Sequence, residues 1–141
     1  MTYVDDSILN TVNDVTNRWG GKDQFEIQYI EDWRGLITSW KKTGGIIVHL
    51  TMYGLDVDKI INHLNIEKRV LVVVGASKVP RGVYSMADYN LAIGHQPHSE
   101  ISALAIFLDR LFKGDELEKY FKDAKIVITP SKEGKRVRLS D

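Results

Sequence analysis

Apolar residues recur along the chain at two spacings, which predict alternating helices and strands. Intervals of three and four residues place side chains on one face of a helix and occur at 8–19, 33–40, 57–64 and 99–112. Alternating or continuous apolar residues predict strands at 25–29, 46–52, 70–74 and 89–93. A shorter helix is predicted over 115–123, and short strands over 2–4, 126–129 and 137–139.

Polar residues and glycines mark the expected ends of the helices. Asp5-Asp6-Ser7 precedes the first helix and supplies side chains that cap free backbone N–H groups, and Gly20-Gly21 stops it. Asp56 opens the helix over 57–64. Ser99 precedes the long helix and is interpreted as its N-cap, with a ligand contact as the alternative, and Gly114 ends that helix.

The order of these elements predicts an α/β fold with a mostly parallel sheet. Val70–Val74 is five apolar residues in a row, which is typical of a central strand covered by helices on both faces. The length of 141 residues fits a single domain, 1–141, in which 124–141 forms a basic C-terminal tail.

Three loops are expected at the carboxyl ends of the strands, where parallel sheets gather their ligands. They cover 50–54, 75–80 and 93–100, and each contains a glycine. The patterns of a phosphate loop and of a dinucleotide-binding turn are absent. The loops are rich in backbone and poor in charge, which suits a flat, uncharged heterocycle such as adenine better than a polyphosphate.

Several loop residues have a structural interpretation that must be weighed against a functional one. His98 is a ligand contact, a general base or a packed loop residue, and Lys78 is by default a surface lysine. Glu100 falls in the first turn of a helix, where the helix dipole favours a carboxylate whatever the function. Pro97 separates strand from helix. Base stacking and core packing are both open for three tyrosines, Tyr53, Tyr84 and Tyr89.

Composition narrows the setting in which the protein works. There is no cysteine, no apolar run long enough to span a membrane, and no basic-then-apolar leader in Met1–Ser7, so we expect a cytoplasmic protein without a membrane partner. The four histidines lack metal-ligand spacing, so no metal is expected.

The charge is balanced over the whole chain but unevenly distributed. The 19 basic and 19 acidic residues give a net charge of zero, which argues against holding DNA or RNA by bulk electrostatics. The first sixty residues carry −3 and the rest +3. The basic end of the chain is either a solvated terminus or an RNA contact.

Three stretches resemble signatures of one enzyme family: His49–Gly54 (HLTMYG), Val72–Pro80 (VVVGASKVP) and Ala87–Leu111 (ADYNLAIGHQPHSEISALAIFLDRL). The family is the archaeal tRNA (cytidine-56-2'-O)-methyltransferases of the SPOUT superfamily, and the resemblance covers about residues 2–130. It implies a SPOUT-type α/β fold with a C-terminal trefoil knot, a homodimer, and S-adenosyl-L-methionine as methyl donor. The implied reaction transfers methyl to the ribose 2'-hydroxyl of a T-loop cytidine in tRNA.

The resemblance also assigns roles to residues. His98 and Glu100 stand where related enzymes place catalytic or substrate-orienting polar side chains. The donor pocket is expected to use fourteen residues from the three loops: Leu50, Gly75, Ala76, Ser77, Lys78, Val79, Ile93, Gly94, His95, Gln96, Pro97, His98, Ser99 and Glu100.

One family motif has no counterpart in this sequence. In the family an arginine motif of the form HRP-x-RD-x-R follows the first strand, whereas Arg18 and Arg34 do not match it and the chain starts at what resembles the second strand. We therefore expect a sheet one strand and one helix shorter than in the family. Two alternatives stay open: a cofactor- or RNA-binding SPOUT domain without turnover, and a SPOUT methyltransferase acting on another RNA.

Overall fold

The computed structural model describes residues 5–65, 67–75 and 78–140, and these form two compact units. The sheet unit comprises Glu31–Glu118, and the hairpin unit comprises Met1–Ile30 with Lys119–Asp141. Each unit is described by itself. The predicted strand over 2–4 lies outside the described residues.

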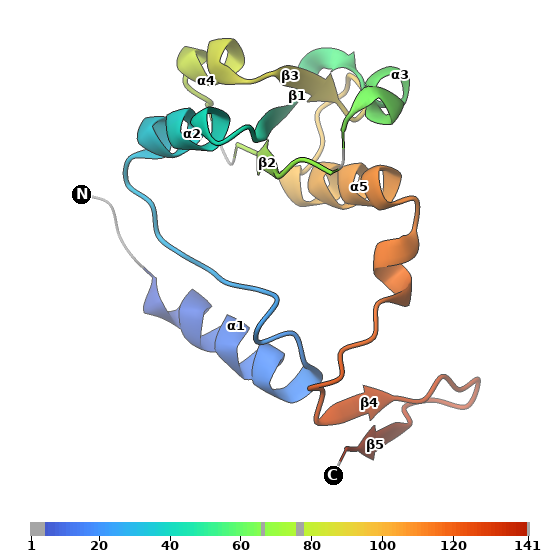
Figure 1. The fold of residues 1–141 in the computed structure, drawn as a ribbon. Coiled ribbons are helices and arrows are strands. Elements are labelled where there is room, and N and C mark those ends of the chain that lie inside the picture. Colours follow the sequence, from blue (N-terminus) through green and yellow to red (C-terminus); the bar gives the residue numbers. More distant parts are fainter. Residues whose placement is uncertain (1–4, 66, 76–77, 141) are drawn as a thin grey trace. The chain divides into compact units, whose positions relative to one another are not determined.

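The sheet unit contains a parallel sheet of three strands in the order β2-β1-β3 (Figure 1). The strands are β1 (Ile46–Asp56), β2 (Val70–Val73) and β3 (Tyr89–Ala92). In the register, Val48 of β1 lies opposite Val72 on one side and Tyr89 on the other. The predicted α/β class with a parallel sheet is therefore confirmed.

The prediction that Val70–Val74 is central is wrong, because β1 holds the centre of the sheet and, among the described residues, β2 pairs with β1 alone. All four residues of β2 are half-buried, whereas Ile47 and Val48 of β1 are 0 % exposed. A continuous apolar run indicates that helices cover both faces of a strand. It carries no information about how many strands pair with its edges.

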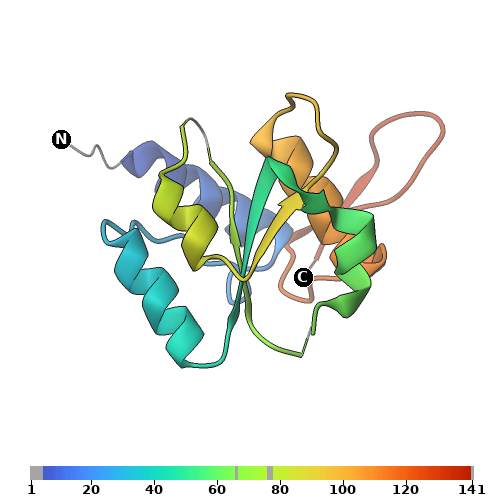
Figure 2. The same cartoon turned by 90° about the horizontal axis from the view of Figure 1, so that it is seen from above.

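Helices lie on both faces of this sheet (Figure 2). On one side are α2 (Trp33–Lys42) and α4 (Arg81–Met86), and on the other are α3 (Val57–Ile60) and α5 (Glu100–Phe112). Two short 3-10 helices complete the unit, η1 (Ile61–His63) and η2 (Asp115–Glu118). The helix predicted over 57–64 is thus α-helical and then 3-10, ending at His63, and the α-helix predicted over 115–123 is only a 3-10 helix over 115–118.

The main core lies between the sheet and α5. Phe107 of α5 is the largest fully buried side chain, and it packs in one cluster with Val48 and Leu91 from two adjacent strands. Helix α5 begins where the sequence predicts: the Ser99 hydroxyl accepts from the Ser102 backbone N–H at 3.1 Å. It ends at Lys113, whose φ of 56° is left-handed, one residue before the predicted Gly114.

Strand β1 is longer than predicted and is interrupted by a bulge. Its register against β3 shifts between Leu50 and Leu55, both of which lie opposite Leu91. The residues expected to form a loop at 50–54 therefore remain part of an irregular strand. A Cβ on Gly54 would lie 2.4 Å from the Asn90 carbonyl oxygen, so only glycine lets the bulge pass this close to β3.

The hairpin unit contains α1 (Asp6–Trp19) and an antiparallel pair, β4 (Ile126–Ile128) with β5 (Val137–Leu139). The predicted cap is confirmed, since the Asp5 carboxylate accepts from the Ser7 backbone N–H at 2.9 Å. The predicted stop is also confirmed, because Gly20 ends α1 with a φ of 90°.

The strand predicted over 25–29 is wrong, since residues 25–30 form neither helix nor strand. Phe25 is 59 % exposed, so the alternation of apolar residues does not report a buried face there. A period of two residues becomes a strand only when a neighbour supplies the other half of the hydrogen bonds. None of the described strands pairs with this segment.

Candidate functional site

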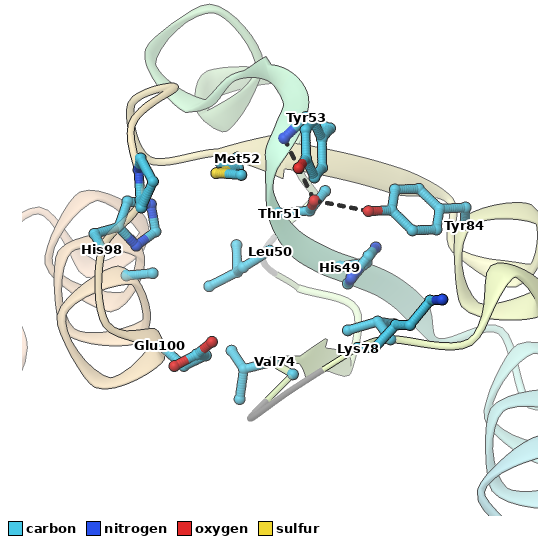
Figure 3. A pocket seen from close by; sticks show the side chains of 14 residues that line it. His49, Leu50, Thr51, Met52, Tyr53, Val74, Lys78, Tyr84, His98 and Glu100 are labelled. Atoms are coloured by element: carbon cyan, nitrogen blue, oxygen red, sulfur yellow. Dashed lines mark hydrogen bonds between the residues drawn. The ribbon is translucent and has the colours of Figure 1, made fainter.

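A cavity of about 540 Å³ opens beside the bulge of β1 in the sheet unit (Figure 3). Its walls come from β1 and its bulge, from the segment after β2, from α4, and from the start of α5. The lining residues are His49, Leu50, Thr51, Met52, Tyr53, Val74, Gly75, Lys78, Val79, Tyr84, Pro97, His98, Glu100 and Ala103.

Half of the predicted site residues line this cavity: Leu50, Gly75, Lys78, Val79, Pro97, His98 and Glu100. Each of the three loops chosen from glycine placement contributes at least one of them. Five others do not line it, namely Ile93, Gly94, His95, Gln96 and Ser99. Ala76 and Ser77 lie outside the described residues.

The other seven lining residues were not among the predicted donor-pocket residues, although Thr51, Met52 and Tyr53 lie within the predicted 50–54 loop. His49, Thr51, Met52 and Tyr53 line the cavity because the bulge turns residues of both strand faces toward it. Tyr84 comes from α4, a six-residue helix too short to give an apolar stripe. Tyr53 is 75 % exposed, so the core interpretation of this tyrosine is wrong.

A chain of hydrogen bonds fixes one wall of the cavity. The Asn90 amide nitrogen donates to the Tyr84 carbonyl at 3.1 Å, so its oxygen faces His49 and accepts from Nδ1 at 2.8 Å. The edge of the His49 ring meets the Tyr84 ring with centroids 4.7 Å apart. The Tyr84 hydroxyl in turn lies 3.0 Å from the Thr51 hydroxyl.

His49 has one buried ring nitrogen, Nε2, that takes no part in these hydrogen bonds. The residue is 0 % exposed, and its Nε2 has no hydrogen-bond partner among the described residues. Buried polar atoms without a partner are rare in folded proteins and call for one. Because Nδ1 donates to Asn90, Nε2 is the ring atom that remains for another group.

A carboxylate and an imidazole face an ammonium group across the cavity. His98 and Glu100 lie at the start of α5, and Lys78 lies on the opposite side (Figure 3). His98 Nδ1 lies 3.2 Å from the Ser99 carbonyl oxygen, which can only accept, so Nδ1 is the donor. In the neutral ring this leaves Nε2 with a lone pair that can take up a proton.

His95 does not line the cavity but holds its wall together. Its Nδ1 lies 2.8 Å from the Met52 carbonyl and its Nε2 lies 2.6 Å from the Asp56 carboxylate. The hydrogen bond to Asp56, followed by that to Met52, raises the pKa of His95. The pKa of Asp56 is lowered, first by Lys59 and then by His95. The segment after β3 is thereby tied to Met52 within the bulge and to Asp56 just after it.

The two hydrogen bonds of His95, to Met52 and Asp56, form a clamp that predicts a pH-dependent stability. Both partners of His95 only accept, so both contacts require the protonated ring. Because the pKa is raised on folding, the stabilisation is fully present below the ordinary value of 6.5 and is lost as pH rises through the folded value. The free energy of unfolding, measured with urea from neutral to alkaline pH, should therefore fall as the pH rises. The variant His95→Gln should show a smaller fall. Parallel pH profiles for the native chain and the variant would contradict the clamp.

Comparison with known proteins identifies the family. A family model described as tRNA ribose 2'-O-methyltransferase, aTrm56, matches residues 19–138. The chain belongs to this methyltransferase family.

Individual relatives agree with the family model. A tRNA (cytidine(56)-2'-O)-methyltransferase of Methanopyrus kandleri is 52% identical over 133 residues, covering 94% of this chain and 74% of the relative. Enzymes with the same name from Thermococcus kodakarensis and Methanocaldococcus jannaschii are 52% and 50% identical, over 94% and 96% of this chain and 74% and 76% of the relatives.

Two features are absent from the described residues. None of their helices has the length and apolar character needed to cross a membrane. The same residues contain no group of three or more His, Cys, Asp or Glu side chains suited to hold a metal ion.

Proposed function

We propose that this chain transfers a methyl group from S-adenosyl-L-methionine to the ribose 2'-hydroxyl of cytidine 56 in the T-loop of tRNA. The observation that carries the proposal is that the family assignment and the position of the cavity agree. The chain is a tRNA ribose 2'-O-methyltransferase by family, and the three signature stretches each contribute residues to one cavity.

The cavity has properties that suit the methyl donor. Its volume of about 540 Å³ lies in the range of small-molecule sites. Leu50, Val74 and Ala103 offer apolar walls for a purine, and the Glu100 carboxylate offers a counter-charge for the cationic part of the molecule. The Nε2 of His49, which has no hydrogen-bond partner among the described residues, supplies a buried polar atom on the same wall. When bound, S-adenosylmethionine supplies a methyl group already activated by its positive sulfur.

The protein has two remaining tasks, which are to align the ribose oxygen and to take its proton. We assign the proton to His98, whose Nε2 is the free ring nitrogen once Nδ1 donates to the Ser99 carbonyl. Glu100, two residues further on at the first turn of α5, orients the substrate or the resulting imidazolium. Lys78, on the opposite side of the cavity, stabilises developing negative charge on the oxygen.

The resemblance in the signature stretches supports further proposals about the whole molecule. These are a SPOUT-type domain with a C-terminal trefoil knot spanning 1–141, a homodimer, and a cytoplasmic setting in which tRNA is the partner. Sedimentation equilibrium checks the homodimer: a mass of twice 16.1 kDa is expected, and a monomer would contradict it.

The function is tested in two stages. Calorimetric titration with S-adenosylmethionine should give heat and a thermal shift, and the absence of both would refute the donor site. Incubation with unmodified tRNA and methyl-labelled donor should then label the RNA. Donor binding without label transfer would instead support a binding domain without turnover. Label at another position, or in another RNA only, would support a different substrate.

A further inference from the structure

The antiparallel hairpin of the hairpin unit concentrates the positive charge of the chain. Between Lys125 and Ser140 there are five basic residues and one acidic residue, a net charge of +4. The whole chain is neutral, so all its other residues together carry −4. The basic residues are Lys125, Lys132, Lys135, Arg136 and Arg138, and every one of them is exposed.

Strand pairing sorts this segment into two faces. Val127 lies opposite Arg138, and the flanking backbone bonds join Thr129 to Arg136 and Ser140 to Lys125. Side chains opposite each other in an antiparallel pair share a face. Lys125, Arg136 and Arg138 therefore lie on one face, and the other face carries only apolar side chains, Ile126, Ile128, Val137 and Leu139.

The cations of the basic face are largely free to bind a partner. Among the described residues, Arg136 pairs with Glu133 at 2.6 Å, and no ion pair is formed by Lys125 or Arg138. Arg136 directly precedes β5 and Arg138 lies within it, so the two stand about 6.8 Å apart along an extended backbone. Lys132 and Lys135 in the connecting turn extend the same positive region beyond the strands.

We propose that this basic face binds the phosphodiester backbone of the substrate RNA. The inference rests on the proposed function, because it takes tRNA as the partner. A regular row of cations on a short ribbon suits regularly spaced phosphates, and arginine binds phosphate through two parallel N–H groups. Without base-specific groups the face supplies affinity and register, while the cavity of the sheet unit selects the reacting ribose.

Two double variants separate this role from bulk charge. Lys125→Gln with Arg138→Gln removes two cations of the basic face, and Lys42→Gln with Lys68→Gln removes two exposed cations of the sheet unit. Affinity for unmodified tRNA is measured by fluorescence anisotropy at a series of KCl concentrations. Methyl transfer is measured in parallel with tRNA varied and donor saturating, and unfolding by urea verifies that both variants fold.

The hairpin variant should bind tRNA about tenfold more weakly. The slope of the logarithm of its binding constant against the logarithm of the KCl concentration should be shallower by about 1.5. Its KM for tRNA should rise by the same factor as its affinity falls, while kcat at saturating tRNA is unchanged. The control variant should match the native chain. Equal losses in both variants, or a fall in kcat alone, would overturn the inference.

The remaining outcomes also decide between the proposals. If the native chain methylates tRNA and the hairpin variant binds tRNA normally, this inference fails while the proposed function stands. If the native chain has no affinity for tRNA, both fail. If the native chain binds anionic lipid vesicles and the hairpin variant loses this binding while its tRNA affinity is intact, the inference is overturned in favour of a membrane surface.

Discussion

Replacing Gly54 by alanine is expected to lower the free energy of unfolding by about 3 kcal/mol. The added Cβ would lie 2.4 Å from the Asn90 carbonyl oxygen and 2.7 Å from the Leu91 backbone nitrogen. These are backbone atoms of β3, so no side-chain rotation relieves the overlap. Asn90 also holds His49 and the Tyr84 carbonyl, so any shift of β3 moves a wall of the cavity. Urea denaturation followed by circular dichroism measures the loss.

Gly82→Ala is the matched control for this substitution. Gly82 lies in α4, and the nearest atom to its added Cβ is 3.7 Å away, at ordinary contact distance. Alanine is also the better helix former, so the control should be neutral or stabilising by up to about 1 kcal/mol. If Gly54→Ala unfolds at the same urea concentration as the native chain, β1 and β3 do not approach as described.

Replacing Gly75 by valine is expected to abolish donor binding while leaving the fold intact. Gly75 follows β2 and lines the cavity, where a branched side chain would occupy space that the ligand needs. We expect affinity for S-adenosylmethionine to fall by about a hundredfold or more, which corresponds to about 2.7 kcal/mol. Calorimetric titration measures this, and far-ultraviolet circular dichroism should show unchanged secondary structure.

The control for this second variant is Gly82→Val, which adds the same side chain outside the cavity. It should bind the donor as the native chain does. Retained affinity in Gly75→Val would mean that the ligand lies elsewhere. Equal loss in both valine variants would point to a general loss of structure.

The sequence predicts those elements whose causes are local. Helix α5 is an example, because a strong apolar stripe ending in Phe107 and Leu111 and a serine cap at Ser99 are contained within fifteen residues. The aspartate cap and glycine stop of α1 are equally local. The strand over 25–29 fails because a strand depends on a partner elsewhere in the chain, which the alternation of Phe25 and Tyr29 does not reveal.

The site was predicted in the same uneven way. Glycine placement and the order of strands are sufficient to bring Leu50, Gly75 and His98 to one cavity, because parallel strands end on the same side. The bulge was not predictable, because it depends on Gly54 meeting the backbone of Asn90, thirty-six residues later. The contacts of His95 with Met52 and Asp56 arise from that same bulge, so its role as a clamp could not be read from the sequence.

The proposed activity of this chain is methylation of the ribose of cytidine 56 in tRNA. Its most direct test is a reaction of the native chain with unmodified tRNA and S-adenosylmethionine, followed by mass spectrometry of nuclease fragments. One added methyl group is expected on the ribose of cytidine 56, and none when that nucleotide carries a 2'-deoxyribose. No methylation, methylation of a base, or methylation at another position would contradict it.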